Sequence, residues 1–156
     1  MPAGSEPAAQ PALPPLPRTW RPLGARVVGL GVTVTLIAVV AVGWFSFDAQ
    51  TRAAFTGFQR GTLVFFGLLY LALMLGLVRS RATAYDDRLL VVNGYRRHEY
   101  HWAQIVAVRL PPGAPWVTLD LADGETASVL GIQGSDGARA RAAVRELRAL
   151  VAASSA

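Results

Sequence analysis

Two long stretches without any charged residue dominate the pattern of hydrophobic and polar positions in this 156-residue chain. The first runs from Val27 to Phe47 and the second from Gly61 to Val78. With a rise of about 1.5 Å per residue, helices of 21 and 18 residues reach across a hydrocarbon core of roughly 30 Å. The pattern therefore predicts two transmembrane helices, residues 27–47 and 61–78, joined by an external loop at residues 48–60.

A cleaved signal peptide is the alternative interpretation of the first stretch. Arg26 precedes the stretch, and residues 39–41 resemble a cleavage site. The stretch is longer than the apolar core of ordinary signal peptides, and it ends in Trp44 and Phe45, aromatic residues typical of a membrane interface. These two features favour a retained membrane span.

Residues 1–26 precede the first stretch and are rich in Pro and Ala. Such a composition buries too little apolar surface to offset the entropy of ordering, so it predicts a disordered tail. The membrane orientation follows from arginine, because the chain contains no lysine. Three arginines precede the first span, two lie in the loop and three closely follow the second span: Arg18, Arg21, Arg26, Arg52, Arg60, Arg79, Arg81 and Arg88. This distribution predicts a multi-pass protein of the inner cell membrane with both termini in the cytoplasm.

After Val78 the pattern changes to short alternating segments separated by turn residues. Asn93-Gly94 between apolar runs predicts a β-hairpin, and residues 111–115 and Asp123-Gly124 mark two further turns. The segments between these turns predict about six antiparallel strands, including Thr83–Tyr85, Gln104–Leu110, Val117–Leu121 and Thr126–Ile132. From Ser135 the spacing becomes helical, and an apolar stripe is formed by Ala140, Val144, Leu147 and Val151. Residues 79–156 are thus expected to form a small α+β domain closed by one C-terminal helix, with Ser135 or Asp136 as its N-cap.

A two-residue turn at Asn93-Gly94 fixes how the hairpin strands pair. The expected opposite pairs are Val92–Tyr95, Leu90–Arg97 and Arg88–Glu99. The last pair brings opposite charges together across the ladder, for about 0.2–1 kcal/mol. Arg97 shares one face with Leu90, whereas Arg96 and His98 lie on the other face. The three bases are therefore split between two faces and do not form one continuous anion site.

The order of these segments resembles the bacterial pleckstrin-homology-like (PH-like) domains, in particular the membrane-anchored family of low molecular weight protein antigen 6. The resemblance covers residues 85–150 and is carried by Asp87-Arg88-Leu89 leading into Val92-Asn93-Gly94, His101-Trp102 with Ile105, Leu119 to Gly124, and the closing helix with Val144 and Leu147. It implies a PH-like fold at a membrane and no catalytic residues. Eukaryotic PH domains that bind phosphoinositides carry clustered basic residues in the loop that joins their first two strands. The corresponding loops here are expected to be Asp86-Asp87 and Asn93-Gly94, which are acidic or neutral.

Few side chains in the sequence are arranged for chemistry. The chain has no cysteine, and His98 and His101 are three residues apart on an expected strand, so their rings point to opposite faces and no metal site is predicted. Asp86-Asp87 is interpreted as a turn and not as a catalytic acid pair. Ten arginines against eight acids in residues 79–156 give a charge of only +2, which disfavours nucleic acid as a partner. We expect no enzyme activity and no cofactor.

The sequence therefore predicts a non-enzymatic, membrane-anchored PH-like domain protein that acts as a protein-interaction or scaffold module at the cytoplasmic membrane. Two alternatives stay open: a domain that binds anionic lipid, and a structural subunit of a larger membrane complex bound through its spans. The expected partners are the lipid bilayer and an unknown protein, which includes a second copy of this chain. Tyr95 and Arg97 are the predicted contacts for that protein.

Overall fold

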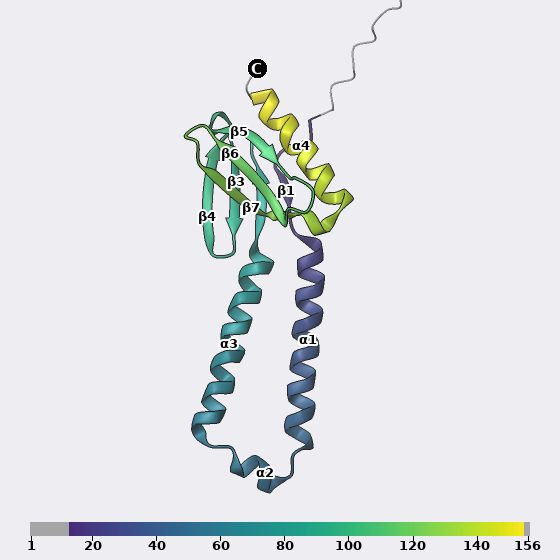
Figure 1. Cartoon of the computed structure of the whole chain (residues 1–156), viewed down its shortest axis with the longest axis vertical. Coiled ribbons are helices and arrows are strands. Elements are labelled where there is room, and N and C mark those ends of the chain that lie inside the picture. Colours follow the sequence, from purple (N-terminus) through teal and green to yellow (C-terminus); the bar gives the residue numbers. More distant parts are fainter. Residues whose placement is uncertain (1–12, 155–156) are drawn as a thin grey trace, which may run out of the picture.

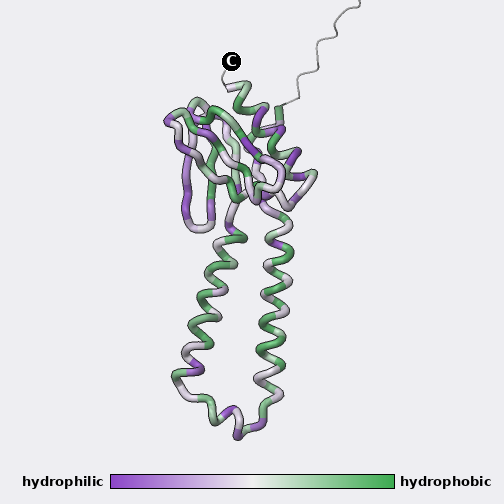
Figure 2. The backbone as a smooth tube through the Cα atoms, in the orientation of Figure 1, coloured by the Kyte–Doolittle hydropathy of each residue, from purple (hydrophilic) through white to green (hydrophobic). Residues whose placement is uncertain are grey.

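The computed structural model describes residues 13–154 and shows a long helix hairpin attached to a small β-rich domain (Figure 1). The hairpin consists of helices α1 (Leu23–Ser46) and α3 (Gly57–Arg79), joined by the short helix α2 (Ala49–Ala54). Figure 2 shows apolar residues along the length of both long helices. Only 6% of the most apolar window of each helix is buried, so neither is the core helix of a soluble fold. Both are long and apolar enough to cross a membrane.

The expected spans, residues 27–47 and 61–78, fall on α1 and α3, and each helix begins four residues earlier than its span. The expected loop, residues 48–60, contains α2 and is ordered by helix caps. Asp48 accepts a hydrogen bond from the backbone nitrogen of Thr51 at 2.7 Å. Thr56 and Gln59 form a reciprocal capping box at the start of α3.

The segment before α1 belongs to the domain, contrary to the predicted disordered tail of residues 1–26. Arg18–Trp20 form strand β1, which pairs antiparallel with strand β2 (Arg81–Ala84). Trp20 is only 8% exposed and lies in the hydrophobic core. A three-residue strand is too short to leave a readable alternation in the sequence. The prediction is wrong for residues 18–26, and residues 1–12 lie outside the described part of the chain.

Seven strands form two antiparallel sheets in the described residues, one strand more than expected. The first sheet has the order β1-β2-β3-β4, with β3 at Arg88–Asn93 and β4 at Arg96–His101. The second has the order β5-β6-β7, formed by Ile105–Arg109, Trp116–Leu121 and Thr126–Gln133. Helix α4 (Ala138–Ser154) packs against the sheets (Figure 1). The predicted fold class, two apolar helices followed by antiparallel strands and one C-terminal helix, is confirmed.

The core lies between the two sheets and α4. The predicted apolar stripe of α4 is confirmed, because all four of its residues are buried: Ala140, Val144, Leu147 and Val151. Leu147 is fully buried, as are Leu89 and Leu119 from the two sheets. Burial of a side chain of this size contributes about 1.5–3 kcal/mol, so this stripe holds α4 on the sheets.

The helix hairpin is inserted between two neighbouring strands of one sheet. β1 ends at Trp20 and its partner β2 begins at Arg81, so α1, α2 and α3 together form the connection between them. The loops expected to correspond to this connection, Asp86-Asp87 and Asn93-Gly94, instead join β2 to β3 and β3 to β4. Because β1 precedes the membrane stretches, the first two strands of the described chain are joined by the helix hairpin and not by either of these loops. This connection carries a basic residue at each end, Arg21 and Arg79.

The hairpin of β3 and β4 forms, but its turn lies one residue later than predicted. Asn93 pairs with Arg96, so Gly94 and Tyr95 are the turn residues. Gly94 has a φ of 64°, the positive value that the first turn residue of a type II′ turn requires. Tyr95, the second turn residue, has no positive φ, because no described non-glycine residue has one. The predicted pairs are therefore wrong by two residues, and the observed pairs are Val92–Arg97, Leu90–Glu99 and Arg88–His101.

A shift of two residues preserves the faces of the strands. Arg97 and His98 still lie on opposite faces, as predicted. The expected ion pair also forms, diagonally, with Arg88 Nε 3.3 Å from Glu99 Oε2. The physical reason for the shift is Asn93, whose side chain is bonded to strand β7 and which therefore stays in its own strand instead of entering the turn.

Candidate functional site

Tyr95 and Arg97, the predicted partner contacts, make different contacts in the structure. Tyr95 Oη donates a hydrogen bond to the carbonyl oxygen of Ala72 in α3 at 2.5 Å, and the guanidinium of Arg79 lies 5.8 Å from the ring centroid. Tyr95 therefore fixes the tip of the β3–β4 hairpin to α3. Arg97 Nη2 lies 2.5 Å from Glu99 Oε1 on the surface of β4. Their role as contacts for a protein partner stays a prediction.

Ser80 makes the second link between the domain and α3. It is fully buried and stands directly between α3 and β2. Its Oγ donates to the carbonyl oxygen of Gly76 at 3.3 Å and accepts from the backbone nitrogen of Gly94 at 3.0 Å. The hairpin tip is thus held on the last turns of α3 by both Ser80 and Tyr95.

Asp136 links the domain to α1. Its carboxylate accepts hydrogen bonds from the backbone nitrogens of Leu23, at 3.0 Å, and Gly24, at 2.8 Å. Pro22, at the N-cap position of α1, has no side chain able to do this. The sequence pattern predicts Ser135 or Asp136 as the N-cap of the C-terminal helix. That assignment is wrong, because α4 begins only at Ala138 and the carboxylate caps a different helix.

Arginines without a carboxylate partner surround this junction. None of the ion pairs in the described part of the chain involves Arg21, Arg26, Arg79, Arg81, Arg96 or Arg139. The guanidinium of Arg26 donates to the carbonyl oxygen of Val78, which connects the start of α1 to the end of α3, while its Nε is buried without a partner. The junction therefore carries more arginines than carboxylates, at the level where α1 begins and α3 ends.

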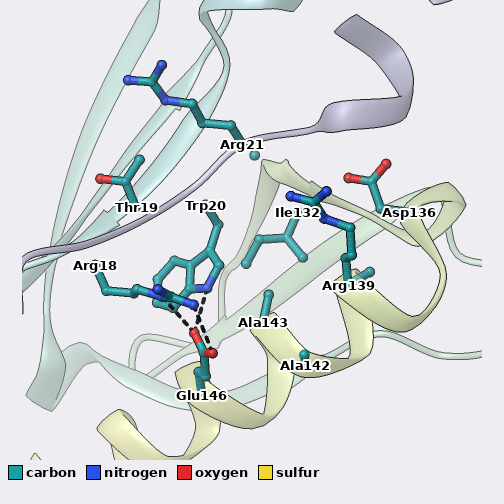
Figure 3. Close-up of a pocket in the computed structure, with 12 residues that line it drawn as sticks. Arg18, Thr19, Trp20, Arg21, Ile132, Asp136, Arg139, Ala142, Ala143 and Glu146 are labelled. Atoms are coloured by element: carbon teal, nitrogen blue, oxygen red, sulfur yellow. Dashed lines mark hydrogen bonds and ion pairs between the residues drawn. The ribbon is translucent and has the colours of Figure 1, made fainter. Parts of the chain in front are cut away.

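A cavity of about 340 Å³ lies between β1 and α4, beside the junction (Figure 3). Arg18 forms two hydrogen bonds to Glu146, at 2.9 and 3.0 Å, and Trp20 Nε1 donates to the same carboxylate at 3.0 Å. Figure 3 shows Arg21 turned away from these groups and Arg139 close to Asp136. Glu146 therefore connects β1 to α4, and its carboxylate is occupied by Arg18 and Trp20.

The histidines of β4 do not come together. His98 and His101 lie on opposite faces of the strand, as their spacing predicts, and the ring of His98 stacks on that of Tyr100 with centroids 6.2 Å apart. Burial, with the nearby charges of Glu125 and Asp123, raises the pKa of Tyr100. Within residues 13–154, no three His, Asp or Glu side chains are grouped to hold a metal ion.

Comparison with known proteins shows which family the domain is similar to. Residues 79–150 match the bacterial PH domain family. The uncharacterized protein Rv1417 of Mycobacterium tuberculosis and the uncharacterized protein Mb1452 of Mycobacterium bovis are each 29% identical to this chain over 133 residues, 85% of this chain and 84% of the relative. A match of this length extends well before residue 79 and takes in both long helices. No solved structure matches the chain. From strand β2 through most of helix α4, residues 79–150, the chain is therefore similar to the bacterial PH domain family.

Proposed function

We propose that this protein is a non-catalytic interaction module in which a membrane-spanning helix hairpin holds a PH domain at the surface of the bilayer, where the domain binds a protein partner. One observation carries the proposal: the domain is fixed to the ends of both helices, by Asp136 on α1 and by Ser80 and Tyr95 on α3. A domain attached at two points has a set orientation relative to the membrane. The surface of the domain that points away from the helices is then held in a constant direction relative to the membrane, where partners can reach it.

Photocrosslinking tests this role against that of a structural subunit bound through its spans. We would place a photoreactive phenylalanine at His101, exposed at the far end of β4, and in a second variant at Phe65, 61% exposed on α3. A module predicts a discrete protein adduct from His101 in native membranes and none from Phe65. Adducts from Phe65 alone would show that the chain is bound through its helices.

We place both termini and the domain on the cytoplasmic side of the inner membrane. The support is the arginine distribution together with the two apolar helices. Because the chain lacks cysteine, single cysteines at Gln50 and Ser154 report the topology without background. A membrane-impermeant maleimide applied to intact cells should label only the Gln50 site. Labelling of Ser154 alone would move the domain to the outer side.

Anionic lipid is the second candidate ligand, favoured by the unpaired arginines of the junction. Each basic side chain near an anionic surface contributes about 1 kcal/mol. The full chain reconstituted in mixed phosphatidylglycerol and phosphatidylcholine nanodiscs should enrich phosphatidylglycerol, and Arg21→Gln with Arg81→Gln should reduce that enrichment. The control variant, Arg141→Gln with Arg145→Gln, removes the same charge from α4. Equal enrichment in all three proteins would eliminate the lipid site.

A further inference from the structure

A groove of about 600 Å³ separates the outer edges of strands β4 and β7. Three consecutive residues of each strand line it, residues 98–100 and residues 126–128. Because side chains alternate between the faces of a strand, three residues in a row border one groove only along the edge of the strand. β4 ends one sheet and β7 ends the other, so neither edge carries a ladder in the described structure. The groove therefore lies between two strand edges with free backbone groups.

The end of the groove near α3 is closed by Asn93. Its Nδ2 donates to the carbonyl oxygen of Ser128 at 2.6 Å, and its Oδ1 accepts from the backbone nitrogen of Leu130 at 3.0 Å. These are backbone groups on the outer edge of β7, which a neighbouring strand would otherwise pair. One side chain thus replaces part of a missing ladder, and among the described residues the part of the edge at Thr126, before Ser128, is left open.

The other end of the groove is acidic. Asp123 and Glu125, in the turn between β6 and β7, line it and form no ion pair in the described part of the chain. Burial, together with the negative charges of Glu125 and Asp123, raises the pKa of Tyr100 on β4, so these carboxylates act on the opposite wall of the groove. Glu99 is already paired with two arginines. The unbalanced charge in the groove is therefore negative.

A second copy of the chain does not fit this edge. β4 runs along the direction of the long helices (Figure 1). Two copies related by a two-fold axis along the membrane normal would bring their β4 strands together in parallel. Arg96 of one copy would then face Arg96 of the other, and Arg97 would face Arg97. Like charges at facing positions are destabilising, and charged edge strands oppose self-pairing. Charge on this edge therefore disfavours pairing of two copies through β4.

We propose that this groove binds an extended segment of a partner protein that carries Lys or Arg, pairs with the open edge of β4 and places its basic side chains beside Asp123 and Glu125. The proposal rests on the proposed function and names the class of partner that the module takes. In strand addition, backbone hydrogen bonds give affinity and alternate side chains give specificity. β4 has six residues, which matches a partner segment of about 20 Å.

The test uses the isotope-labelled full chain in nanodiscs and a pool of capped hexapeptides with Lys at alternate positions and Val, Thr, Ile or Tyr between them. We expect saturable chemical-shift changes confined to β4 and residues 122–128. A pool with Glu in place of Lys should give none. Asp123→Asn with Glu125→Gln should weaken binding about tenfold, as for the loss of two exposed charge pairs.

The matched control is Asp86→Asn with Asp87→Asn, which removes two charges from the β2–β3 turn outside the groove. It should bind within about twofold of the natural chain. The proposal is overturned if the lysine pool gives no saturable change, if the glutamate pool binds equally, or if the groove variant binds like the natural chain. If peptide binding fails while His101 still gives photocrosslinks, the groove is excluded as the binding site and the proposed function is retained.

Discussion

The carboxylate of Asp136 lies 2.8 Å from the backbone nitrogen of Gly24, a residue 112 positions earlier in the chain. The positive end of helix α1 is thus neutralised by a side chain of the PH domain and not by its own preceding residues. The membrane hairpin and the domain therefore stabilise each other. A substitution at this contact should therefore destabilise both the start of α1 and the domain.

Replacing Asp136 with Ala should lower the free energy of unfolding by about 1 kcal/mol, the usual cost of losing a helix N-cap. It should also speed amide hydrogen exchange at Leu23 and Gly24, which lose their acceptor. Exchange measured in nanodiscs checks this, with Ser135→Ala as the neighbouring control. Unchanged exchange at both amides would show that the cap does not form in the membrane.

Gly24→Ala should weaken the same contact from the other side. A Cβ at this position would lie 2.9 Å from Asp136 Oδ1, so the carboxylate must move. Gly31→Ala is the matched control, because a Cβ there meets nothing within 4 Å. Faster exchange at Leu23 is expected for the first variant only, and equal behaviour of the two variants would contradict the close approach.

Asn93→Ala should destabilise the domain by about 1–3 kcal/mol, because the partly buried backbone groups of Ser128 and Leu130 lose their partners. Asn93→Asp keeps the acceptor for Leu130 but sets a carboxylate oxygen against the carbonyl oxygen of Ser128, so it should not restore the natural stability. Thermal or denaturant unfolding of the full chain in detergent measures both. If Asn93→Ala unfolds like the natural protein, water replaces this side chain without cost and the bridge between the strand edges is dispensable.

The two interactions of Glu146 should separate on mutation. Glu146→Gln loses the charge pair with Arg18, whose side chain is 44% exposed, and should cost less than about 1 kcal/mol. Glu146→Ala also removes the acceptor of Trp20 Nε1 and should cost about 1–3 kcal/mol. Unfolding at low and high salt distinguishes the charge pair with Arg18 from the hydrogen bond of Trp20, because salt screens only the charge pair. Equal costs for the two variants would mean that the ion pair dominates.

Tyr100 should titrate above the ordinary tyrosine value of 10.0, because burial and the charges of Glu125 and Asp123 disfavour the phenolate. Since the pKa is raised in the folded state, the stability that Tyr100 contributes is complete below the ordinary value and is lost as the pH rises through the raised pKa. Site-resolved NMR titration of the ring checks the direction. Asp123→Asn with Glu125→Gln should shift the pKa downward, and no shift would remove these carboxylates as a cause.

Patterns that depend on local spacing were readable from the sequence. The charge-free stretches marked α1 and α3, since length and composition alone decide whether a helix reaches across a bilayer. The stripe from Ala140 to Val151 marked the buried face of α4, and the alternation in β3 and β4 assigned Arg97 and His98 to opposite faces. Each of these follows from the period of a helix or a strand, which neighbouring residues repeat.

Features that depend on distant partners were decided only by the tertiary structure. β1 is three residues long and is recognisable only beside β2, from which sixty residues of helix hairpin separate it. The turn moved to Gly94-Tyr95 because Asn93 bonds to β7, and Asp136 caps α1 instead of α4 because the fold brings that helix end to it. The groove between β4 and β7 likewise exists only where two sheets end side by side. Local periodicity was thus enough to predict the long helices, most of the strands and the buried face of α4, whereas β1 and the pairing of strand and helix ends depend on contacts between residues that lie far apart in the chain.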